Sequence, residues 1–197
     1  YDAQQILAEL ADSLHTTNDI PCLLEGVAKN LQSALQTESV MIFLRHEQSG
    51  DYASVYGCSY SADEGHAIPN HNDYRLSRHA VTVSQIAQTG ALLELDGSEP
   101  GFELAALNEH SRLTAEEQHT LSALKATLLL PLKTKNGMPG LIALGSRLGD
   151  LPFSGEDKRL LQSVAASASL ALENAQLVER MLIEARRRQE IEAENEQ

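Results

Sequence analysis

Long apolar runs, paired cysteines and an excess of basic charge are all missing from this sequence. No stretch of about 18 apolar residues occurs, and no basic segment precedes an apolar one, so we expect neither a membrane-spanning helix nor a secretion signal. Cys22 and Cys58 are far apart and form no Cys-x-x-Cys motif. Two cysteines in a chain of 197 residues do not build a disulfide framework, which favours a reducing, cytoplasmic environment.

Basic residues are outnumbered by acidic ones, 15 to 28, and the formal net charge is −13. Broad nucleic-acid binding needs basic side chains that replace the counterions of the phosphate backbone, so this balance argues against that function. The single basic run, 186–188, has Glu184, Glu190 and Glu192 at helical spacing around it. We interpret the run as a solvated, self-paired helix face rather than a phosphate-binding patch.

The longest feature that is present is an apolar periodicity that starts after Phe153. Ser154 followed by Asp157 is a capping-box type of helix start, and after Gly155 neither glycine nor proline interrupts the segment. Forty-odd residues make a helix of roughly 60 Å, whereas a domain of this size is only about 35 Å across. The last two dozen residues should therefore leave the globular body with an apolar stripe that favours a partner helix.

We expect this partner to be a second copy of the chain, in a parallel homodimer formed through both terminal helices. One face of the long helix would cover its own sheet and another would meet the second copy. The residues assigned to this dimer and relay surface are Leu7, Leu10, Leu14, Leu161, Ala168, Ala175, Val178, Leu182 and Ala185. Because the chain opens on Tyr1 and stops inside a helical pattern, we also expect it to be part of a longer polypeptide with a further effector domain.

Between the terminal helices, helical and alternating apolar patterns follow one another. The helix that begins near Asp19 has Pro21 in its first turn, where a missing N–H costs nothing. Asn136-Gly137 is the usual signature of a type I′ turn and predicts a hairpin. The remaining predicted elements are strands at 39–45, 52–60, 91–95, 127–133 and 140–145, and helices at 79–89 and 114–125.

This order predicts an α+β fold with a central antiparallel sheet. The N- and C-terminal helices would pack on one face, and the long loop and helix excursion between the second strand and the last hairpin would cross the other. A long crossover on a sheet makes a cleft, and such clefts bind small ligands. The topology suggests that the pocket is lined by Phe43, Tyr56, Cys58, Tyr74, His79 and Leu130.

Several short motifs occur together in an order and at a spacing that resemble the GAF domain, from about Asp19 to Ala175. These motifs are Leu130-Pro131-Leu132, Asn136-Gly137, Gly140-Leu-Ile-Ala-Leu-Gly145, Phe153-Ser-Gly-Glu-Asp157 and Leu170-Ala-Leu-Glu-Asn-Ala175. The resemblance implies a sensory domain over 19–175, a signalling helix over 1–18 and a coiled-coil-type exit helix over 176–197. GAF domains are sensory and dimerisation modules of cytoplasmic signalling proteins, beside histidine kinases, serine phosphatases, diguanylate cyclases or transcriptional activators. The exit helix also resembles the linker before serine phosphatase domains of the sporulation and stress-response type.

The ligand chemistries known in that family do not fit these residues well. Cyclic-nucleotide binders carry an Asn-Lys pair where this chain has Ser146-Arg147, and although Phe153 and Asp157 match their next motif, Lys158 replaces its glutamate. Bilin binders attach the chromophore to a cysteine in the excursion, where this chain has none. Free methionine sulfoxide reductases need two cysteines that converge across the cleft. The resemblance therefore implies no specific cofactor.

Other constellations carry no chemistry either. The spacing of His66, His71 and His79 fits no zinc signature, so we assign no metal site. Ser146 and Ser154 are not part of a Gly-x-Ser-x-Gly motif, and we assign no catalytic residue. Two functions remain: a sensory domain that relays occupancy of its cleft, and a constitutive dimerisation scaffold whose cleft is filled by its own side chains.

Overall fold

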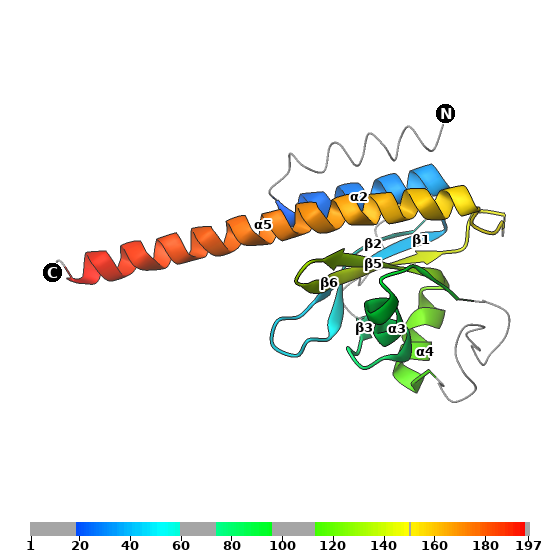
Figure 1. The fold of residues 1–197 in the computed structure, drawn as a ribbon, viewed down its shortest axis with the longest axis horizontal. Coiled ribbons are helices and arrows are strands. Elements are labelled where there is room, and N and C mark those ends of the chain that lie inside the picture. Colours follow the sequence, from blue (N-terminus) through cyan, green and yellow to red (C-terminus); the bar gives the residue numbers. More distant parts are fainter. Residues whose placement is uncertain (1–18, 60–73, 96–112, 150, 196–197) are drawn as a thin grey trace.

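The computed structural model describes residues 19–59, 74–95, 113–149 and 151–195, and shows three layers (Figure 1). The middle layer is a six-stranded antiparallel sheet in the order β3-β2-β1-β6-β5-β4. Helices α2 (Ile20–Leu35) and α5 (Gly155–Asn195) lie side by side on one face, and α3 (Val81–Thr89) and α4 (Ala115–Ala123) lie on the other. The strands are β1 (Ser39–Arg45), β2 (Tyr52–Ser59), β3 (Arg75–Leu76), β4 (Leu93–Glu94), β5 (Ala126–Thr134) and β6 (Gly137–Gly145). The predicted fold class is confirmed.

Side-chain caps hold the starts of α5 and α4. At the start of α5 the capping box is reciprocal: the Ser154 hydroxyl accepts the Asp157 N–H at 3.1 Å, and the Asp157 carboxylate accepts the Ser154 N–H at 2.8 Å. At the start of α4 the Thr114 hydroxyl accepts the Glu117 N–H at 3.2 Å. These contacts satisfy N–H groups that a helix cannot pair internally, which explains why the sequence predicts both starts to within a residue.

The β5–β6 hairpin lies where Asn136-Gly137 predicts it, but its turn is not of type I′. Thr134 pairs with Gly137, so Lys135 and Asn136 form the turn. Gly137 has a φ of +130°, whereas the described non-glycine residues with positive φ are Gln36 and Lys125. A register shift after Leu132 accompanies the turn. The chain therefore reverses its direction through a bulge and one glycine with positive φ, whereas a type I′ turn needs two residues with positive φ.

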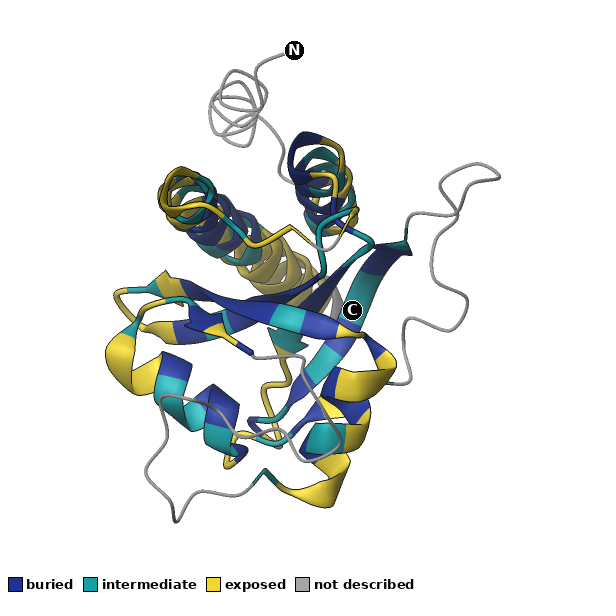
Figure 2. Cartoon of the chain, turned by 90° about the vertical axis from the view of Figure 1, so that its right-hand side faces the viewer, coloured by how far each residue is buried: buried dark blue, intermediate teal, exposed yellow. Residues whose placement is uncertain are grey.

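The sheet is apolar on both faces and separates two cores. Along β1 the side chains alternate, with Val40 and Ile42 facing α2 and α5, and Met41 and Phe43 facing α3 and α4. We call the first the helix-pair core and the second the short-helix core. Figure 2 shows buried residues along the strands and in the helices on either side of the sheet.

Candidate functional site

The six residues predicted to line one pocket are not brought together by the fold. Buried Phe43 and half-buried Tyr74 belong to the short-helix core. The side chains of Tyr56, Cys58 and Leu130 belong to the helix-pair core, on the opposite face of the sheet. His79 is exposed at the surface, where its ring nitrogen accepts a hydrogen bond from Arg78 Nε at 2.9 Å.

Two details of register account for this division. In the β1–β2 pair, Ile42 lies opposite Tyr56 but Phe43 lies opposite Ser54, so Val55 is an extra residue in a bulge. The bulge turns Tyr56 and Cys58 towards the helix-pair core, whereas Tyr52 before it faces the short-helix core.

Leu130 lies on the helix-pair face of the sheet, opposite to the face that the sequence suggests, because the expected alternation along β5 is off by one residue. It pairs with Ile142, which faces the helix pair, while its neighbour Leu129 faces α3 and α4. A one-residue slip in a strand moves every side chain to the other face, so periodicity alone could not decide between the two.

A buried carboxylate joins the two helices on the short-helix side. Glu117, on α4, is 2% exposed, and its carboxylate accepts the N–H of Val81 at 3.2 Å and the N–H of Thr82 at 2.8 Å. It also accepts the Thr82 hydroxyl. Ala80, at the N-cap of α3, offers no side-chain acceptor, so Glu117 caps the N-terminus of α3 from another helix. The sequence shows only the local Thr114 capping motif and gives no sign of this second partner.

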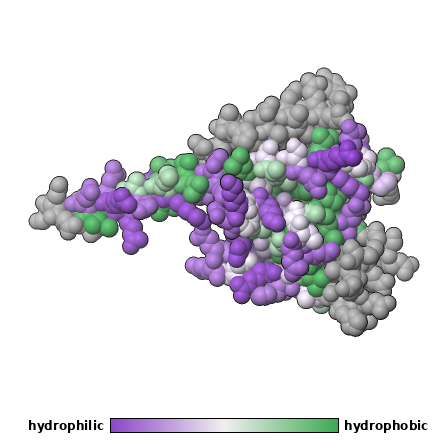
Figure 3. Space-filling view, in the orientation of Figure 1, coloured by the Kyte–Doolittle hydropathy of each residue, from purple (hydrophilic) through white to green (hydrophobic). Residues whose placement is uncertain are grey.

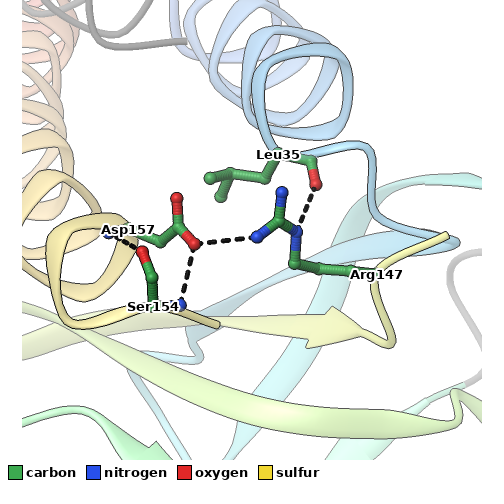
Figure 4. A network of polar contacts seen from close by, with 4 residues as sticks. All are labelled: Leu35, Arg147, Ser154 and Asp157. Atoms are coloured by element: carbon green, nitrogen blue, oxygen red, sulfur yellow. Dashed lines mark hydrogen bonds and ion pairs between the residues drawn. The ribbon is translucent and has the colours of Figure 1, made fainter. Parts of the chain in front are cut away.

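On the other face, a polar network ties the end of α2 to the start of α5 (Figure 4). Arg147, just after β6, donates through Nε to the backbone oxygen of Leu35 at 3.2 Å and through a terminal nitrogen to Asp157 Oδ2 at 2.9 Å. The same carboxylate oxygen accepts the backbone N–H of Ser154. The Arg147 and Asp157 side chains are 25% and 16% exposed, so this ion pair is shielded from solvent. Asp157 matches a motif of the cyclic-nucleotide binders, but these contacts give it a structural role that requires no nucleotide.

We predict that Arg147→Lys lowers the free energy of unfolding by about 1 kcal/mol, because a single ammonium group does not reproduce the fork that reaches both Leu35 and Asp157. Urea unfolding followed by circular dichroism measures the change. Arg159→Lys is the matched control, since Arg159 is exposed near the start of α5, and it should change the value by less than about 0.5 kcal/mol. Equal losses in the two variants would contradict a special role for Arg147.

Helix α5 carries two apolar stripes, and the structure corrects which of them is free. Leu161, Ala168 and Ala175, predicted for the dimer surface, are 0%, 3% and 1% exposed and pack in the helix-pair core. Of the other predicted positions, Val178 is half-buried, Leu182 and Ala185 are exposed, and Leu7, Leu10 and Leu14 lie outside the described residues. The large apolar side chains that α5 exposes are Leu170, Leu177, Met181, Leu182, Ile183 and Ile191.

The second half of α5 projects beyond the sheet, and apolar side chains interrupt its polar surface in the space-filling view (Figure 3). Where α5 leaves the sheet, a groove of about 360 Å³ separates it from the β5–β6 turn. Two contacts span this groove: Asn136 Nδ2 donates to Glu173 Oε1 at 2.9 Å, and Arg180 pairs with Glu47 at 2.7 Å. The ion pair of Arg180 and Glu47 is exposed and contributes little to stability, so the projecting segment is only weakly attached to the rest of the domain.

The two thiols do not form a redox pair. Cys22 is exposed on α2, whereas Cys58 is buried in the helix-pair core, and burial raises the pKa of the Cys58 thiol to about 11. A buried thiol of that pKa is a poor nucleophile at neutral pH. Among the described residues, no group of three or more His, Cys, Asp or Glu side chains is placed to hold a metal ion. The described helices also include none that is long and apolar enough to cross a membrane.

Known proteins share this architecture at low sequence identity. The chain is similar to diguanylate cyclase A of Treponema denticola, with 23% identity over 185 residues that cover 91% of this chain and 44% of that protein. It is similar in fold to the GAF domain of a phosphoenolpyruvate-protein phosphotransferase from Coxiella burnetii, with 12% identity and a TM-score of 0.65 over 91% of this chain and 97% of that one. Free methionine-R-sulfoxide reductase from Neisseria meningitidis, solved with its substrate, gives 13% identity and a TM-score of 0.58 over 89% and 91%.

The chain thus spans less than half the length of its curated relative. The two solved structures come from proteins that are named for different reactions, so these likenesses show the fold alone. The GAF domain family matches residues 19–174, which is most of the sequence, and the chain belongs to this family.

Proposed function

We propose that this GAF domain is a cytoplasmic sensory module that pairs with a second copy through α5 and relays occupancy of a small-molecule site to an attached output domain. As a GAF domain, the chain is a regulatory domain and not itself an enzyme. The observation that carries the proposal is the continuity of α5. One helix of 41 residues has its first half built into the helix-pair core and its second half outside it.

The projecting half of α5 exposes several large apolar side chains to water. Leu177, Met181 and Leu182 are 47%, 68% and 56% exposed. Full burial of an exposed side chain of this size contributes about 1.5–3 kcal/mol, and each of the three would gain about half to two thirds of that amount on becoming fully buried. A second α5 offers a matching apolar surface by symmetry. The exit helix over 176–197 would then connect the pair to its output domain, which we propose to be a signalling enzyme, as in the diguanylate cyclase that the chain resembles.

In this proposal we assign the small-molecule site to the face that carries α3 and α4, because α2 and α5 cover the other face of the sheet. Binding would shift the output only if the ligand favoured one packing of α5 over another. A specific observation supports the alternative, a ligand-free scaffold: on the described part of that face, Phe43, Leu129 and Leu141 are each 0% exposed and fill the space themselves.

A native mass spectrum of the freshly purified chain tests both ideas. The proposal expects a dimer with an added mass of a few hundred daltons, whereas a dimer without added mass would favour the scaffold. A monomer at tens of micromolar would contradict the dimeric relay.

A charged substitution in the exposed stripe should abolish this dimer. We expect Leu177→Asp to weaken dimerisation by at least about 100-fold, because two leucines lose their burial and two carboxylates face each other. Ile183→Asp is the control: Ile183 is 60% exposed on the same helix, but on the side opposite Met181, and its substitution should leave the dimer intact. Equal effects would place the contact elsewhere.

A further inference from the structure

The exposed stripe of α5 has a heptad phase of its own, with one polar residue at its centre. Leu170, Asn174, Leu177 and Met181 follow one another at steps of four, three and four residues, which is the spacing of a coiled-coil seam. Leu170, Leu177 and Met181 are 49%, 47% and 68% exposed, and Asn174 is exposed as well. We call these four residues the outer seam.

The outer seam cannot be a continuation of the core-facing stripe. Successive residues of a helix are about 100° apart, so Leu170 and Leu177 lie far around the helix from Leu161, Ala168 and Ala175. The latter three are buried against the chain's own sheet and α2. The outer seam is therefore available to a second copy while the fold stays intact.

The position of Asn174 distinguishes the ways in which two such helices can pair. In heptad terms Leu170 and Leu177 are d positions, and Asn174 and Met181 are a positions. In a parallel, in-register pair, Asn174 meets Asn174 of the second copy, and one amide donates to the other. In an antiparallel pair or a shifted register it faces an apolar layer instead, and its amide loses its partner on leaving water.

We infer that Asn174 fixes the parallel, in-register pairing of two α5 helices, an inference that rests on the proposed dimer. The parallel arrangement brings both C-terminal ends of α5 to the same side, as a paired output domain requires. The energy of association comes from the leucine and methionine layers, and the amide layer selects the geometry at some expense of stability.

Charges beyond the outer seam agree with this geometry. Arg187 and Glu192 occupy g and e positions five residues apart, so a parallel pair places each Arg187 beside Glu192 of the second copy. The next seam layers are Glu184 and Arg188, which pair within one helix at 2.8 Å. In a parallel dimer each of these layers brings two like charges together. We therefore expect the two helices to pack closely over 170–181 and less closely after it.

A disulfide reporter tests the orientation. In the full 197-residue chain with exposed Cys22 replaced by serine, Arg188→Cys places one thiol in a seam layer. In a parallel, in-register dimer the two thiols meet, whereas in an antiparallel dimer centred on the outer seam they lie about 37 Å apart. Oxidation with copper phenanthroline should therefore cross-link most of the parent dimer, as seen by non-reducing electrophoresis.

The role of Asn174 is tested by Asn174→Leu in the same background. We expect the variant to remain associated, by light scattering, while the cross-linked fraction falls to half or less of the parent's. Glu179→Leu is the matched control: it adds a leucine to an exposed position of α5 outside the outer seam and should cross-link like the parent.

Each contrary result has its own meaning. A parent dimer that does not cross-link, or an Asn174→Leu variant that cross-links as fully as the parent, overturns the inference and leaves the proposed dimer standing. A monomeric parent overturns the proposed dimer, and the inference with it.

Discussion

Replacing Leu161 by alanine lowers the free energy of unfolding by about 2.5–5 kcal/mol, the range for large-to-small changes at fully buried leucines. Leu161 is 0% exposed and lies in the helix-pair core, where α5 covers the sheet. The loss combines the apolar surface returned to water and the cavity left between α5 and its neighbours. Urea or guanidinium unfolding of the Leu177→Asp form measures it without a contribution from dimerisation.

The matched control is Leu170→Ala in the same monomeric form. Leu170 is on the same helix, nine residues later, but is 49% exposed, so we expect a loss below about 1 kcal/mol. The pair of variants thus measures the difference between the two stripes of α5. A loss at Leu170 that equals the loss at Leu161 would mean that the outer seam is already covered within one chain.

Replacing Glu117 by alanine costs about 2–4 kcal/mol, for a different reason. The substitution removes one buried carboxylate that accepts the N–H groups of Val81 and Thr82 and the Thr82 hydroxyl. Buried donors that lose their acceptor keep their desolvation cost, and α3 loses the negative charge at its N-terminus. Chemical unfolding gives the total, and hydrogen exchange of the Val81 and Thr82 amides should accelerate first.

Two further variants of α4 define the cause. Glu117→Gln keeps an acceptor oxygen without the charge, so we expect about half of the loss. Glu116→Ala removes an exposed carboxylate from the adjacent position and should change stability by less than about 0.5 kcal/mol. If Glu116→Ala were as costly as Glu117→Ala, the effect would come from the charge of the first turn of α4 and not from the link to α3.

The elements of this fold could be predicted because their signals are local. The central strand β1 has the predicted bounds, since seven mostly apolar residues between polar neighbours fit a strand buried on both faces. The capping box at Ser154 and the single cap at Thr114 act within three residues of sequence. For the same reason, the sequence reveals the hairpin at Asn136-Gly137 but not the bulge that shapes its turn.

The placement of side chains at the candidate site depends on contacts that are not local. Val55 forms a bulge only in relation to β1, and that one extra residue decides the face of Tyr56 and Cys58. Glu117 finds its partners 35 and 36 residues away in the sequence. Neither the bulge nor the Glu117 contacts produce a periodic pattern in the sequence. The predicted topology could therefore suggest a cleft but not the residues that line it.

The two stripes of α5 show a third limit. Both repeat every seven residues, so periodicity cannot tell which of them faces the sheet. The alanine-rich stripe is inside because Ala165, Ala168 and Ala171 let α5 come close to the sheet and α2. The leucines at 170 and 177 then remain outside, although hydrophobicity alone would rank them as the better core residues.

The anchoring of the first half of α5 has a mechanical consequence for the second half. The network of Arg147 and Asp157 fixes the first turn, and the helix-pair core holds the helix as far as Ala175. The segment 176–195 then forms a lever of about 30 Å. A tilt of about 10° where this lever leaves the core moves its tip by about 5 Å, close to one helical turn. A small change of packing near Ala175 would therefore become a large displacement at the tip, where the lever meets whatever it drives.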